Sequence, residues 1–567
     1  MHIPLRKRWQ VAEPIPATVA ANLSDYDPIL QQLLFNRNIT TRKEAVLFLD
    51  VEGGSMHDPF LLLGMKTAVE CLLKAIDSEE EIVVYGDYDV DGVTATVLLV
   101  QLLRVYGAKA RGYIPNRFDE GYGLNIEALE GLYWEGVRTI VTVDCGIRSP
   151  REAEYARSKG ITLIISDHHE LEEELPDAPA VICPKQPGDE YPEKNLAGVG
   201  LSFKIAEALL ATRPLPGVRA ENWIDLVAIG TVADVVSLTG ENRSLVKAGL
   251  KMLQYCQRPG LCSLGNAAGL NIQTISSQDI GFAIGPRLNA AGRLESALEA
   301  YALLMVEDIF DAGLLAQKLD DQNRQRQELT RVMQEEAERQ TANANGSELL
   351  FVVHPEFNLG VVGLVASRLT ELFYRPSIVA SQGPEYTRGS CRSIPEFHIT
   401  KALDQCADLL VRHGGHAMAA GFTVQNENLA ELSQRLMDIA QRELGDKSLR
   451  PVLQADAEIT FKELHPQVLD YLDAIEPTGL GNPGHLFVSR NIQVLHYREV
   501  GNDGQHLRLT VRGEGIVHDA IAFRQGFWAR QLPNVVDIMY SFERNTYRGR
   551  DSLQLNVRDI KPTNQPD

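Results

Sequence analysis

Carboxylates cluster in one short segment of the sequence. Asp87, Asp89 and Asp91 occupy alternate positions in Tyr85-Gly-Asp-Tyr-Asp-Val-Asp-Gly92, directly after an apolar run. Three aspartates this close repel one another unless a cation neutralises them, so the spacing favours a metal site. A solvated turn in which a carboxylate caps a helix is the alternative. An EF-hand loop begins in the same way, but the glutamate it needs at its last ligand position is Leu98 here.

Three further segments place acidic or imidazole groups beside apolar runs. Asp144 follows the run 139–143, and the triplet Asp167-His168-His169 follows the run 161–165. Adjacent imidazoles are ready metal ligands. In an extended chain one of them would bind metal while the other faces a substrate, and a pair of surface histidines is the alternative. Asp234 lies in an apolar stretch, where an unpaired carboxylate is costly to bury.

These residues form a set rich in carboxylates and poor in histidine. Such a set favours Mn²⁺ or Mg²⁺ over structural zinc. One or two such ions would assist phosphoester hydrolysis, and a pair would clamp the attacking and leaving oxygens without a covalent nucleophile. The predicted catalytic residues are Asp87, Asp89, Asp91, Asp144, His168, His169 and Asp234.

The surrounding segments alternate between strand and helix patterns. The runs 81–85, 139–143 and 161–165 are apolar and rich in β-branched residues, as in buried parallel strands, and 94–104 has helical spacing. Ligands bind at the carboxyl edge of open α/β sheets. We therefore predict an α/β fold in which these segments meet at one sheet edge.

The remaining patterns predict two α/β domains joined by a long helix, followed by a small β-barrel. The helix should cross solvent, because Asp320–Glu328 is polar on every face, with a disordered linker as the alternative. In 506–512 apolar and polar residues alternate, and 538–542 with 553–557 should form a hairpin. The expected regions are an accessory segment at 1–70, a catalytic domain at 71–310, the connecting helix at 311–345, a second α/β domain at 346–450 and the barrel at 451–567.

The composition is that of a globular chain. The 567 residues suggest roughly three to four domains. No run is apolar enough to span a membrane and no signal region follows the basic start, so we expect a cytoplasmic protein without a membrane partner. The seven cysteines show no CxxC pair, so neither a disulfide framework nor a zinc site is expected. The net charge of −21 argues against nonspecific coating of nucleic acid, but metal-filled sites are locally cationic, so a nucleic-acid substrate is not excluded.

The order of these motifs resembles that of the DHH phosphoesterase superfamily, which is named for its Asp-His-His triplet. The second α/β unit is similar to the accompanying DHHA1 domain through Gly414-Gly415-His416. Over nearly the whole chain the sequence resembles a bacterial family of single-strand-specific 5′-to-3′ DNA exonucleases of DNA repair and recombination. The segments that carry this resemblance are 86–92, 285–293, 389–393 and the C-terminal barrel, which resembles an OB-fold.

The resemblance implies roles for individual residues. The implied metal ligands are Asp89, Asp91, Asp144, His168 and Asp234, with Asp144 between two ions and with Asp87 and His169 as ligands or as supports for ligands. Many superfamily members carry a histidine where this chain has Tyr85, so the second ion is expected to bind weakly or only with substrate.

A second set of residues is predicted to contact phosphate or DNA. Arg287, Asn289 and Arg293 lie in a Gly- and Ala-rich stretch that permits close approach to a phosphate, with Arg–carboxylate pairing as the alternative. Ser390 and Arg392 should share one face of a strand because they are two residues apart. The resemblance implies that these groups hold the 5′-terminal phosphate and the neighbouring backbone. The other members are His416, for which a tight turn is the alternative, and Arg508, Arg512 and Arg548 of the barrel.

The expected function is a two-metal exonuclease that takes single-stranded DNA through a cleft between the two α/β domains, guided by the barrel. A single-strand-binding protein and a helicase are implied as partners by the resemblance alone. The alternatives are a phosphoesterase of the same superfamily with small or short nucleotide substrates, and a noncatalytic single-strand-binding scaffold.

Overall fold

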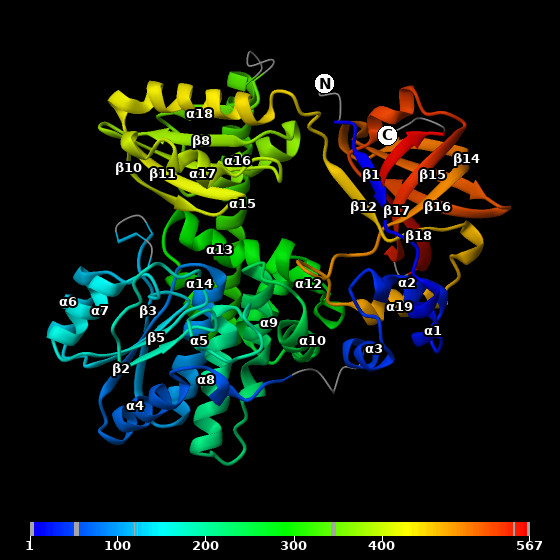
Figure 1. Ribbon diagram of the computed structural model, residues 1–567. Helices are drawn as coiled ribbons and strands as arrows, with labels where there is room; N and C mark the ends of the chain where they lie inside the picture. Colours follow the sequence, from blue (N-terminus) through cyan, green and yellow to red (C-terminus); the bar gives the residue numbers. More distant parts are fainter. Residues whose placement is uncertain are drawn as a thin grey trace. The chain divides into compact units, whose positions relative to one another are not determined.

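The computed structural model describes residues 5–49, 56–117, 120–121, 123–341, 347–547 and 550–563. The chain forms two compact units (Figure 1). Unit 1 consists of Met1–Ala12, Arg324–Ala455 and Lys561–Asp567, and unit 2 consists of Glu13–Asn323 and Asp456–Ile560.

A parallel sheet at the centre of unit 2 carries the predicted metal centre. Its five strands lie in the order β3-β2-β4-β5-β6 and are all parallel. The strands are β2 (Glu81–Tyr85), β3 (Lys109–Tyr113), β4 (Thr139–Val143), β5 (Thr162–Ser166) and β6 (Ala180–Ile182). Because β3 lies on one side of β2 and β4 on the other, the chain reverses its direction of travel between β2 and β4. Ligands of open α/β sheets bind at such a reversal.

Helices cover both faces of this sheet. The strands share one apolar core with α4 (Met65–Asp77), α5 (Val90–Val105), α8 (Gly198–Thr212) and α9 (Ile224–Ala233), and another with α6 (Ile126–Trp134) and α7 (Pro150–Ser158). Every residue from Ile224 to Thr231 of α9 is buried, so this helix is packed on all sides. The unit continues through α10 (Gly240–Gln254), α11 (Pro259–Ala267), α12 (Ser277–Asp279), α13 (Gly285–Leu294) and α14 (Leu298–Met305).

The predicted connecting helix is confirmed as α15 (Ile309–Thr341), which runs from unit 2 into unit 1. The expectation that its middle crosses solvent with every face polar is wrong at the unit 2 end, where Asp320 and Gln322 are buried. Arg287 Nε lies 2.8 Å from Asp320 Oδ1, and Gln322 donates to Glu295 at 3.3 Å. Each of these buried side chains thus has a polar partner outside α15.

The C-terminal barrel has five strands and is closed by pairing of the first strand with the fourth. They are β14 (Phe487–Val500), β15 (His506–Gly513), β16 (Ile516–Ala522), β17 (Val535–Tyr547) and β18 (Arg550–Pro562). Leu507, Leu509 and Val511 are buried while Arg508 and Arg512 are exposed, which confirms the predicted alternation. The last two strands are neighbours in the sheet, as the predicted hairpin requires.

Residues of the predicted accessory segment share the core of the barrel. The helices α1 (Ala17–Asn22), α2 (Pro28–Phe35) and α3 (Arg42–Leu49) lie beside α19 (Gln467–Ile475) in Figure 1, and their apolar residues belong to the same core cluster. Leu33 and Leu34 of α2 are fully buried there. This N-terminal segment therefore completes the barrel core.

Unit 1 contains a mixed sheet in the order β10-β11-β9-β8-β7, in which only β7 and β8 are parallel. Its strands are β7 (Leu350–His354), β8 (Ser377–Gln382), β9 (Tyr386–Arg392), β10 (Leu410–Gly415) and β11 (Ala419–Gln425). The helices are α16 (Val362–Phe373), α17 (Ile399–Asp404) and α18 (Leu429–Leu444). A separate pair of parallel strands joins β1 (Arg8–Val11) to β12 (Val452–Ala455).

One cysteine pair departs from the sequence prediction. Cys256, in the loop after α10, forms a disulfide with Cys262 of α11. The count and spacing of the cysteines indicated no disulfide framework, but they do not report that this loop turns back and brings the two Cα atoms to 5.5 Å. Among the helices in the described part of the chain, none has the length and hydropathy of a membrane-spanning segment.

Candidate metal centre

The structure brings all seven predicted catalytic residues together at the carboxyl edge of the parallel sheet. Their ligand atoms form three overlapping groups, and within each group the atoms lie within 4.8 Å of one another. The groups are Asp87 with Asp89 and Asp144, Asp144 with His168 and His169, and Asp91 with His168 and Asp234. Asp144 and His168 therefore each belong to two groups.

The turn after β2 holds its three aspartates in different ways. Asp89 is the N-cap of α5, and its Oδ1 accepts from the N–H groups of Asp91 at 2.9 Å and Gly92 at 3.1 Å. The capping alternative is thus correct for Asp89, which is also a member of the cluster. A Cβ at Gly92 would lie 2.6 Å from the backbone nitrogen of Asp87, so the turn requires glycine at this position.

Asp91 is held by the N-terminus of α8, a contact that the sequence analysis missed. Its two carboxylate oxygens accept from the N–H groups of Gly198 at 2.6 Å and Val199 at 2.8 Å. A Cβ at Gly198 would lie 2.6 Å from the Cβ of Asp144, so glycine lets this helix begin against the cluster. The available signal was the small-residue segment Ala197-Gly-Val-Gly200 before an apolar helix.

Asp144 follows β4 in the left-handed backbone region, with φ of 62°. A non-glycine residue there is strained, and such strain is concentrated at functional sites. Its Oδ1 lies 3.1 Å from His168 Nε2. Neither of these buried atoms, nor Asp87 Oδ1, makes a hydrogen bond with a described residue. Unsatisfied oxygen and nitrogen atoms that converge in this way fit a divalent cation.

The two histidines lie side by side, contrary to the expectation that they point to opposite faces. Strand β5 ends at Ser166, and Asp167 Oδ1 accepts from the N–H groups of His168 at 2.7 Å and His169 at 3.1 Å. This turn ends the extended chain and brings the ring centroids to 4.7 Å. His169 Nδ1 lies 2.7 Å from Asp167 Oδ1 and 3.9 Å from Asp144 Oδ1.

Asp234 reaches the cluster from the C-terminus of α9. Its Oδ2 lies 3.5 Å from His168 Nε2. Helix α9 can pack closely on α5 because residue 230 is glycine. A Cβ at this position would lie 2.9 Å from Asp91 Oδ1 and still closer to Thr94 Oγ1. The packing of two apolar helices thus places carboxylates from distant parts of the sequence in one site.

Burial and mutual repulsion raise the pKa of Asp87, Asp91, Asp144 and Asp234. Burial, followed by the charge of neighbouring aspartates, raises the pKa of Asp91 to about 7 and that of Asp234 to about 9. The same causes raise the pKa of Asp87 and Asp144 well above the ordinary value. Without a cation these groups cannot all be ionised at neutral pH, so the cluster is built for positive charge.

In the triplet, the pKa of Asp167 and that of His168 are lowered, whereas the pKa of His169 is raised. Burial acts to raise the pKa of Asp167, but the hydrogen bond and charge of His169 outweigh it and lower the pKa to about 2. Burial and the neighbouring His169 lower the pKa of His168 to about 4, so its ring is neutral, as a metal ligand must be. Burial opposes protonation of His169, but its bond to Asp167 prevails and raises its pKa.

Tyr85 occupies the position where many superfamily members carry a histidine. Its side chain is fully buried, and its hydroxyl donates to the Gly123 carbonyl at 3.1 Å and accepts from Asn125. The tyrosine therefore packs between the sheet and α6. Weak binding of a second ion stays a prediction.

In unit 1, Ser390 and Arg392 share one face of β9, as their spacing predicts. Arg392 Nη1 donates to Ser390 Oγ at 3.1 Å, and burial lowers the pKa of Arg392. A Cβ at Gly363, in the first turn of α16, would lie 3.0 Å from Ser390 Oγ. Arg392 makes no ion pair within the described part of unit 1, so its charge is open to an anion.

The other predicted phosphate contacts outside the barrel lie on helix α13 and in the turn between β10 and β11. Arg287, Asn289 and Arg293 lie on α13, and Arg287 is paired with Asp320, as the alternative for this stretch proposed. His416 lies in the turn between β10 and β11, where its N–H donates to Ala419 at 2.7 Å. This is the tight turn named as its alternative. The role of these residues stays a prediction.

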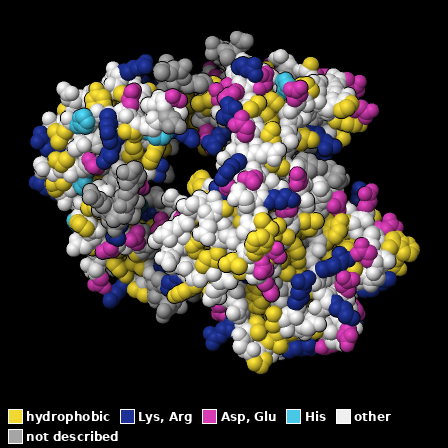
Figure 2. Space-filling view, turned by 180° about the vertical axis from the view of Figure 1, so that it is seen from behind, with side chains coloured by type: hydrophobic (Ala, Val, Ile, Leu, Met, Phe, Trp, Pro, Cys, Tyr) yellow, Lys and Arg dark blue, Asp and Glu magenta, His cyan; other side chains and the backbone are white. Residues whose placement is uncertain are grey.

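The barrel arginines lie on its outer face. Arg508 lies 3.2 Å from Asp519, and Arg512 donates to Gln493 at 2.6 Å, both on neighbouring strands. Arg548 lies outside the described residues. On the face shown in Figure 2, basic and acidic side chains are interspersed, so no large area of that face carries one sign of charge. DNA contacts there would depend on individual groups.

Family models match three parts of the chain. The DHH family N-terminal domain matches residues 81–231, the DHHA1 domain matches residues 346–442, and the RecJ OB domain matches residues 455–559. The first and third matched ranges contain the parallel sheet of unit 2 and the barrel.

Curated relatives cover almost the entire chain. The chain is 36% identical over 561 residues to the single-stranded-DNA-specific exonuclease RecJ of Bacillus subtilis, covering 98% of this chain and 71% of that protein. The RecJ of Escherichia coli is 36% identical over 571 residues, covering 95% of this chain and 96% of the relative. A crystal structure of Thermus thermophilus RecJ in complex with Mn²⁺ superposes with a TM-score of 0.84 at 29% identity, covering 99% of this chain and 80% of that one.

Proposed function

The chain belongs to the RecJ family of single-stranded-DNA-specific exonucleases, and from this premise we propose that it hydrolyses single-stranded DNA from the 5′ end with Mn²⁺ or Mg²⁺ as cofactor. The observation that carries the proposal is the convergence of seven acidic and histidine residues at the carboxyl edge of the parallel sheet. A hydrolytic nuclease of this kind needs positive charge that stabilises the reacting phosphate and activates a water molecule, and it needs no covalent nucleophile.

We assign the metal-ligand role to Asp89, Asp91, Asp144, His168 and Asp234. When bound, one or two divalent ions would neutralise these carboxylates, lower the pKa of an attacking water and stabilise charge on the phosphate. Asp144 is the shared ligand in this proposal, because it belongs to both the Asp87–Asp89 group and the histidine group. The bonds from Gly198 and Val199 orient the Asp91 carboxylate, so that α8 supports the ligand set.

His169 is proposed to contact the substrate. Its Nδ1 donates to Asp167, which orients the ring, and this bond raises the pKa of the imidazole against the effect of burial. A protonated His169 holds a proton at Nε2 that can be donated to a phosphate oxygen or to the leaving oxygen. Asp167 is then a positioning residue for His169.

We propose that Ser390 and Arg392 bind the 5′-terminal phosphate. Their hydroxyl and guanidinium groups are in contact, and a partly buried guanidinium without a carboxylate partner favours an anion. Arg287, Asn289, Arg293 and His416 are proposed to contact neighbouring phosphates. For Arg287 this requires a phosphate to share or replace the pairing with Asp320.

The barrel is proposed to guide the strand through Arg508, Arg512 and Arg548. A single-strand-binding protein and a helicase are inferred as partners from family membership alone, and a cytoplasmic location follows from the DNA substrate of the relatives.

A comparison of three substrates tests the proposed function. In Mn²⁺ the protein should degrade a long 5′-phosphorylated single strand and leave a blunt duplex of the same sequence intact. Hydrolysis of dinucleotides without degradation of the long strand would instead identify a small-substrate phosphoesterase. Binding of the long strand without cleavage would identify a scaffold.

A further inference from the structure

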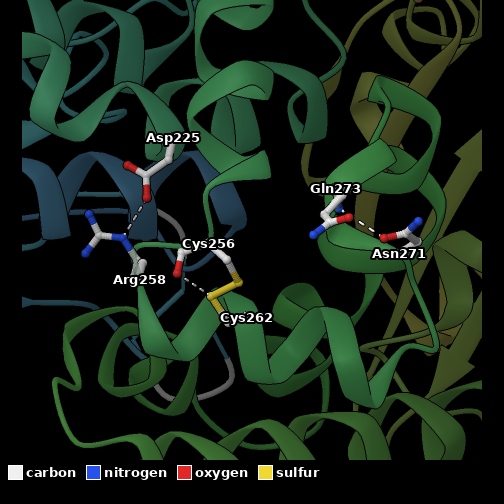
Figure 3. Close-up of a disulfide and its surroundings, with 6 residues drawn as sticks. All are labelled: Asp225, Cys256, Arg258, Cys262, Asn271 and Gln273. Atoms are coloured by element: carbon white, nitrogen blue, oxygen red, sulfur yellow. Dashed lines mark hydrogen bonds and ion pairs between the residues drawn. A yellow bond between two sulfur atoms is a disulfide. The ribbon is translucent and has the colours of Figure 1, made fainter.

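The disulfide lies outside the metal centre and joins Cys256, in the loop after α10, to Cys262 in the first turns of α11. Cys256 is exposed and Cys262 is partly exposed, whereas the other five cysteines are free and four of them are buried. Figure 3 shows the disulfide beside the pair formed by Arg258 and Asp225. Arg258 lies within the loop that the disulfide closes.

Arg258 ties three helices together. Its Nε lies 2.9 Å from Asp225 Oδ2 at the start of α9, and its Nη1 donates to Gln101 of α5 at 3.2 Å and to the Leu304 carbonyl of α14 at 3.0 Å. Asp225 is 6% exposed, and its other oxygen makes no hydrogen bond with a described residue. A buried carboxylate depends strongly on its partner, so Arg258 holds the first turn of α9 in place.

Two of the three helices that Arg258 joins, α5 and α9, carry predicted metal ligands at the ends farther from Arg258. Asp91 lies in the first turn of α5, and Gln101 follows it by about 15 Å along the helix axis. Asp234 caps the C-terminus of α9, about 14 Å from Asp225. A shift of α9 against α5 at the Arg258 end would therefore move Asp234 relative to Asp91.

A cavity of about 240 Å³ lies under the loop. Its lining includes Cys256, Cys262, Arg258, Asp225 and Ile229. The inner side of the loop is consequently packed less tightly than a filled core would be. The position of the loop depends on the disulfide and on the bonds of Arg258.

We propose that Cys256 and Cys262 form a reversible dithiol–disulfide site whose state controls how firmly Arg258 holds α9, and through α9 the placement of Asp234. The proposal rests on the proposed function in one respect, the assignment of Asp234 as a metal ligand. The oxidised state, which the structure contains, is the state in which the ligand set is assembled.

The chemistry of the site is thiol–disulfide exchange with a small thiol such as glutathione. The thiolate of the small thiol attacks one sulfur and expels the other cysteine as a thiolate, and a second small thiol resolves the mixed disulfide. Two cysteine thiols and one small disulfide result, so two electrons and two protons pass to the pair. A small disulfide reverses the reaction.

Accessibility favours this pair over the other cysteines. Exchange requires an approaching thiolate to reach a sulfur atom, and Cys256 is exposed to solvent. Burial raises the pKa of Cys145 and Cys391, which keeps these thiols protonated and unreactive. In a reducing compartment a disulfide of this kind is usually transient and senses redox state.

The test uses the full-length protein equilibrated in glutathione buffers of different redox poise. The first readout is the mass shift after thiol alkylation, the second is hydrogen exchange in 224–234, and the third is Mn²⁺ affinity by titration. We expect the cysteine pair to be alkylated only in reducing buffers. Its reduction should speed exchange in 224–234 and weaken Mn²⁺ binding about fivefold, at the lower end of couplings between sites.

Matched variants identify the residues responsible. Cys256→Ser and Cys262→Ser should show the fast exchange and weak Mn²⁺ binding in every buffer. Cys71→Ser removes a partly exposed thiol of α4 and should respond as the parent does. Arg258→Gln, with the disulfide intact, should show the same fast hydrogen exchange in 224–234 as the reduced protein. This result would identify Arg258 as the positioning residue.

Two results would overturn the proposal: a cysteine pair that is not reduced in any of the buffers, or reduction that changes neither exchange nor Mn²⁺ affinity. Alkylation and exchange do not depend on DNA cleavage. A protein that showed both responses without nuclease activity would retain the redox site and lose the proposed function.

Discussion

The two histidines of the Asp167-His168-His169 triplet have different surroundings, so their replacement should have different effects. His168→Gln should weaken Mn²⁺ binding by at least about tenfold, because its Nε2 faces three carboxylates. His169→Gln should keep Mn²⁺ affinity and lower kcat by about 10²- to 10⁴-fold, the usual effect of losing a proton donor. Metal titration and kinetics on the same samples separate the two effects.

His413→Gln is the matched control, because His413 Nε2 lies 2.9 Å from Asp404 Oδ1 in unit 1 and its replacement should affect neither quantity. Equal loss of Mn²⁺ affinity in the His168 and His169 variants would contradict the different roles.

A second prediction at this scale concerns Arg392. Arg392→Ala should reduce the preference for 5′-phosphorylated over 5′-hydroxyl strands by about 1.5 to 3 kcal/mol, the range for hydrogen bonds to charged groups. Arg388→Ala removes the same charge from an exposed position of the same strand and should leave the preference unchanged. An equal loss on both substrates in the Arg392 variant would mean that the residue supports only the fold.

The clustering of the candidate metal ligands could be predicted from the sequence, but the contacts that support them could not. Asp87, Asp144 and Asp234 each follow or interrupt an apolar run, which marks a costly carboxylate. The bonds that orient Asp91 come from Gly198 and Val199, more than a hundred residues away, and no local pattern reports them. The histidine orientation was wrong because the Asp167 side chain turns the chain directly after β5.

At the scale of the element, the packing of α9 on α5 should tolerate no side chain at Gly230. Gly230→Ala would place a Cβ 2.9 Å from Asp91 Oδ1. We expect a loss of about 1 to 3 kcal/mol in the free energy of unfolding, as for other overpacked cores, together with weaker Mn²⁺ binding. Urea unfolding and metal titration measure both.

Gly131→Ala in α6 provides the contrast, because nothing lies within 4 Å of its Cβ position. This variant should gain about 0.5 to 1 kcal/mol from the lower entropy of its unfolded chain. If Gly230→Ala were as stable as Gly131→Ala, the close helix contact would be refuted.

Elements with strong periodicity were predictable, and elements defined by distant partners were not. The apolar, β-branched runs predicted three of the five strands of the parallel sheet, β2, β4 and β5, but not β3 or β6. The predicted long helix is confirmed as α15. The solvent-crossing middle of α15 was wrong at Asp320, because its partner Arg287 belongs to another helix. The Cys256–Cys262 disulfide was not predicted for a similar reason. Cysteine spacing does not show that the chain turns between α10 and α11 and brings the two residues together.

At the scale of the whole molecule, the barrel is not a removable module. Leu33 and Leu34 of the N-terminal helices are buried in its core cluster, and Arg243 of the catalytic domain donates to the carbonyls of Ala474 and Ile475. Deletion from about residue 451 would expose these surfaces. Neutralising charges on the outer face is a cleaner test of the barrel as a DNA guide.

The double variant Arg508→Gln with Arg512→Gln should weaken binding to long single strands. For each phosphate that the variant no longer binds, the slope of log affinity against log salt should fall by about 0.7. Arg435→Gln on α18 removes a partly exposed charge, paired with Asp408, from unit 1 and is the control. An unchanged affinity and salt slope in the double variant would exclude these two arginines as guides.

One metal cluster, centred on Asp144, is proposed to remove nucleotides from the 5′ end of single-stranded DNA. The most direct test is a time course on a long single strand labelled at its 5′ end, in Mn²⁺, with the parent protein and Asp144→Asn. The parent should release the label in short products from the first turnover. The variant should release none, although its circular dichroism matches that of the parent. Label retained on strands that shorten from the other end, or release by the variant at the parent's rate, would contradict the account.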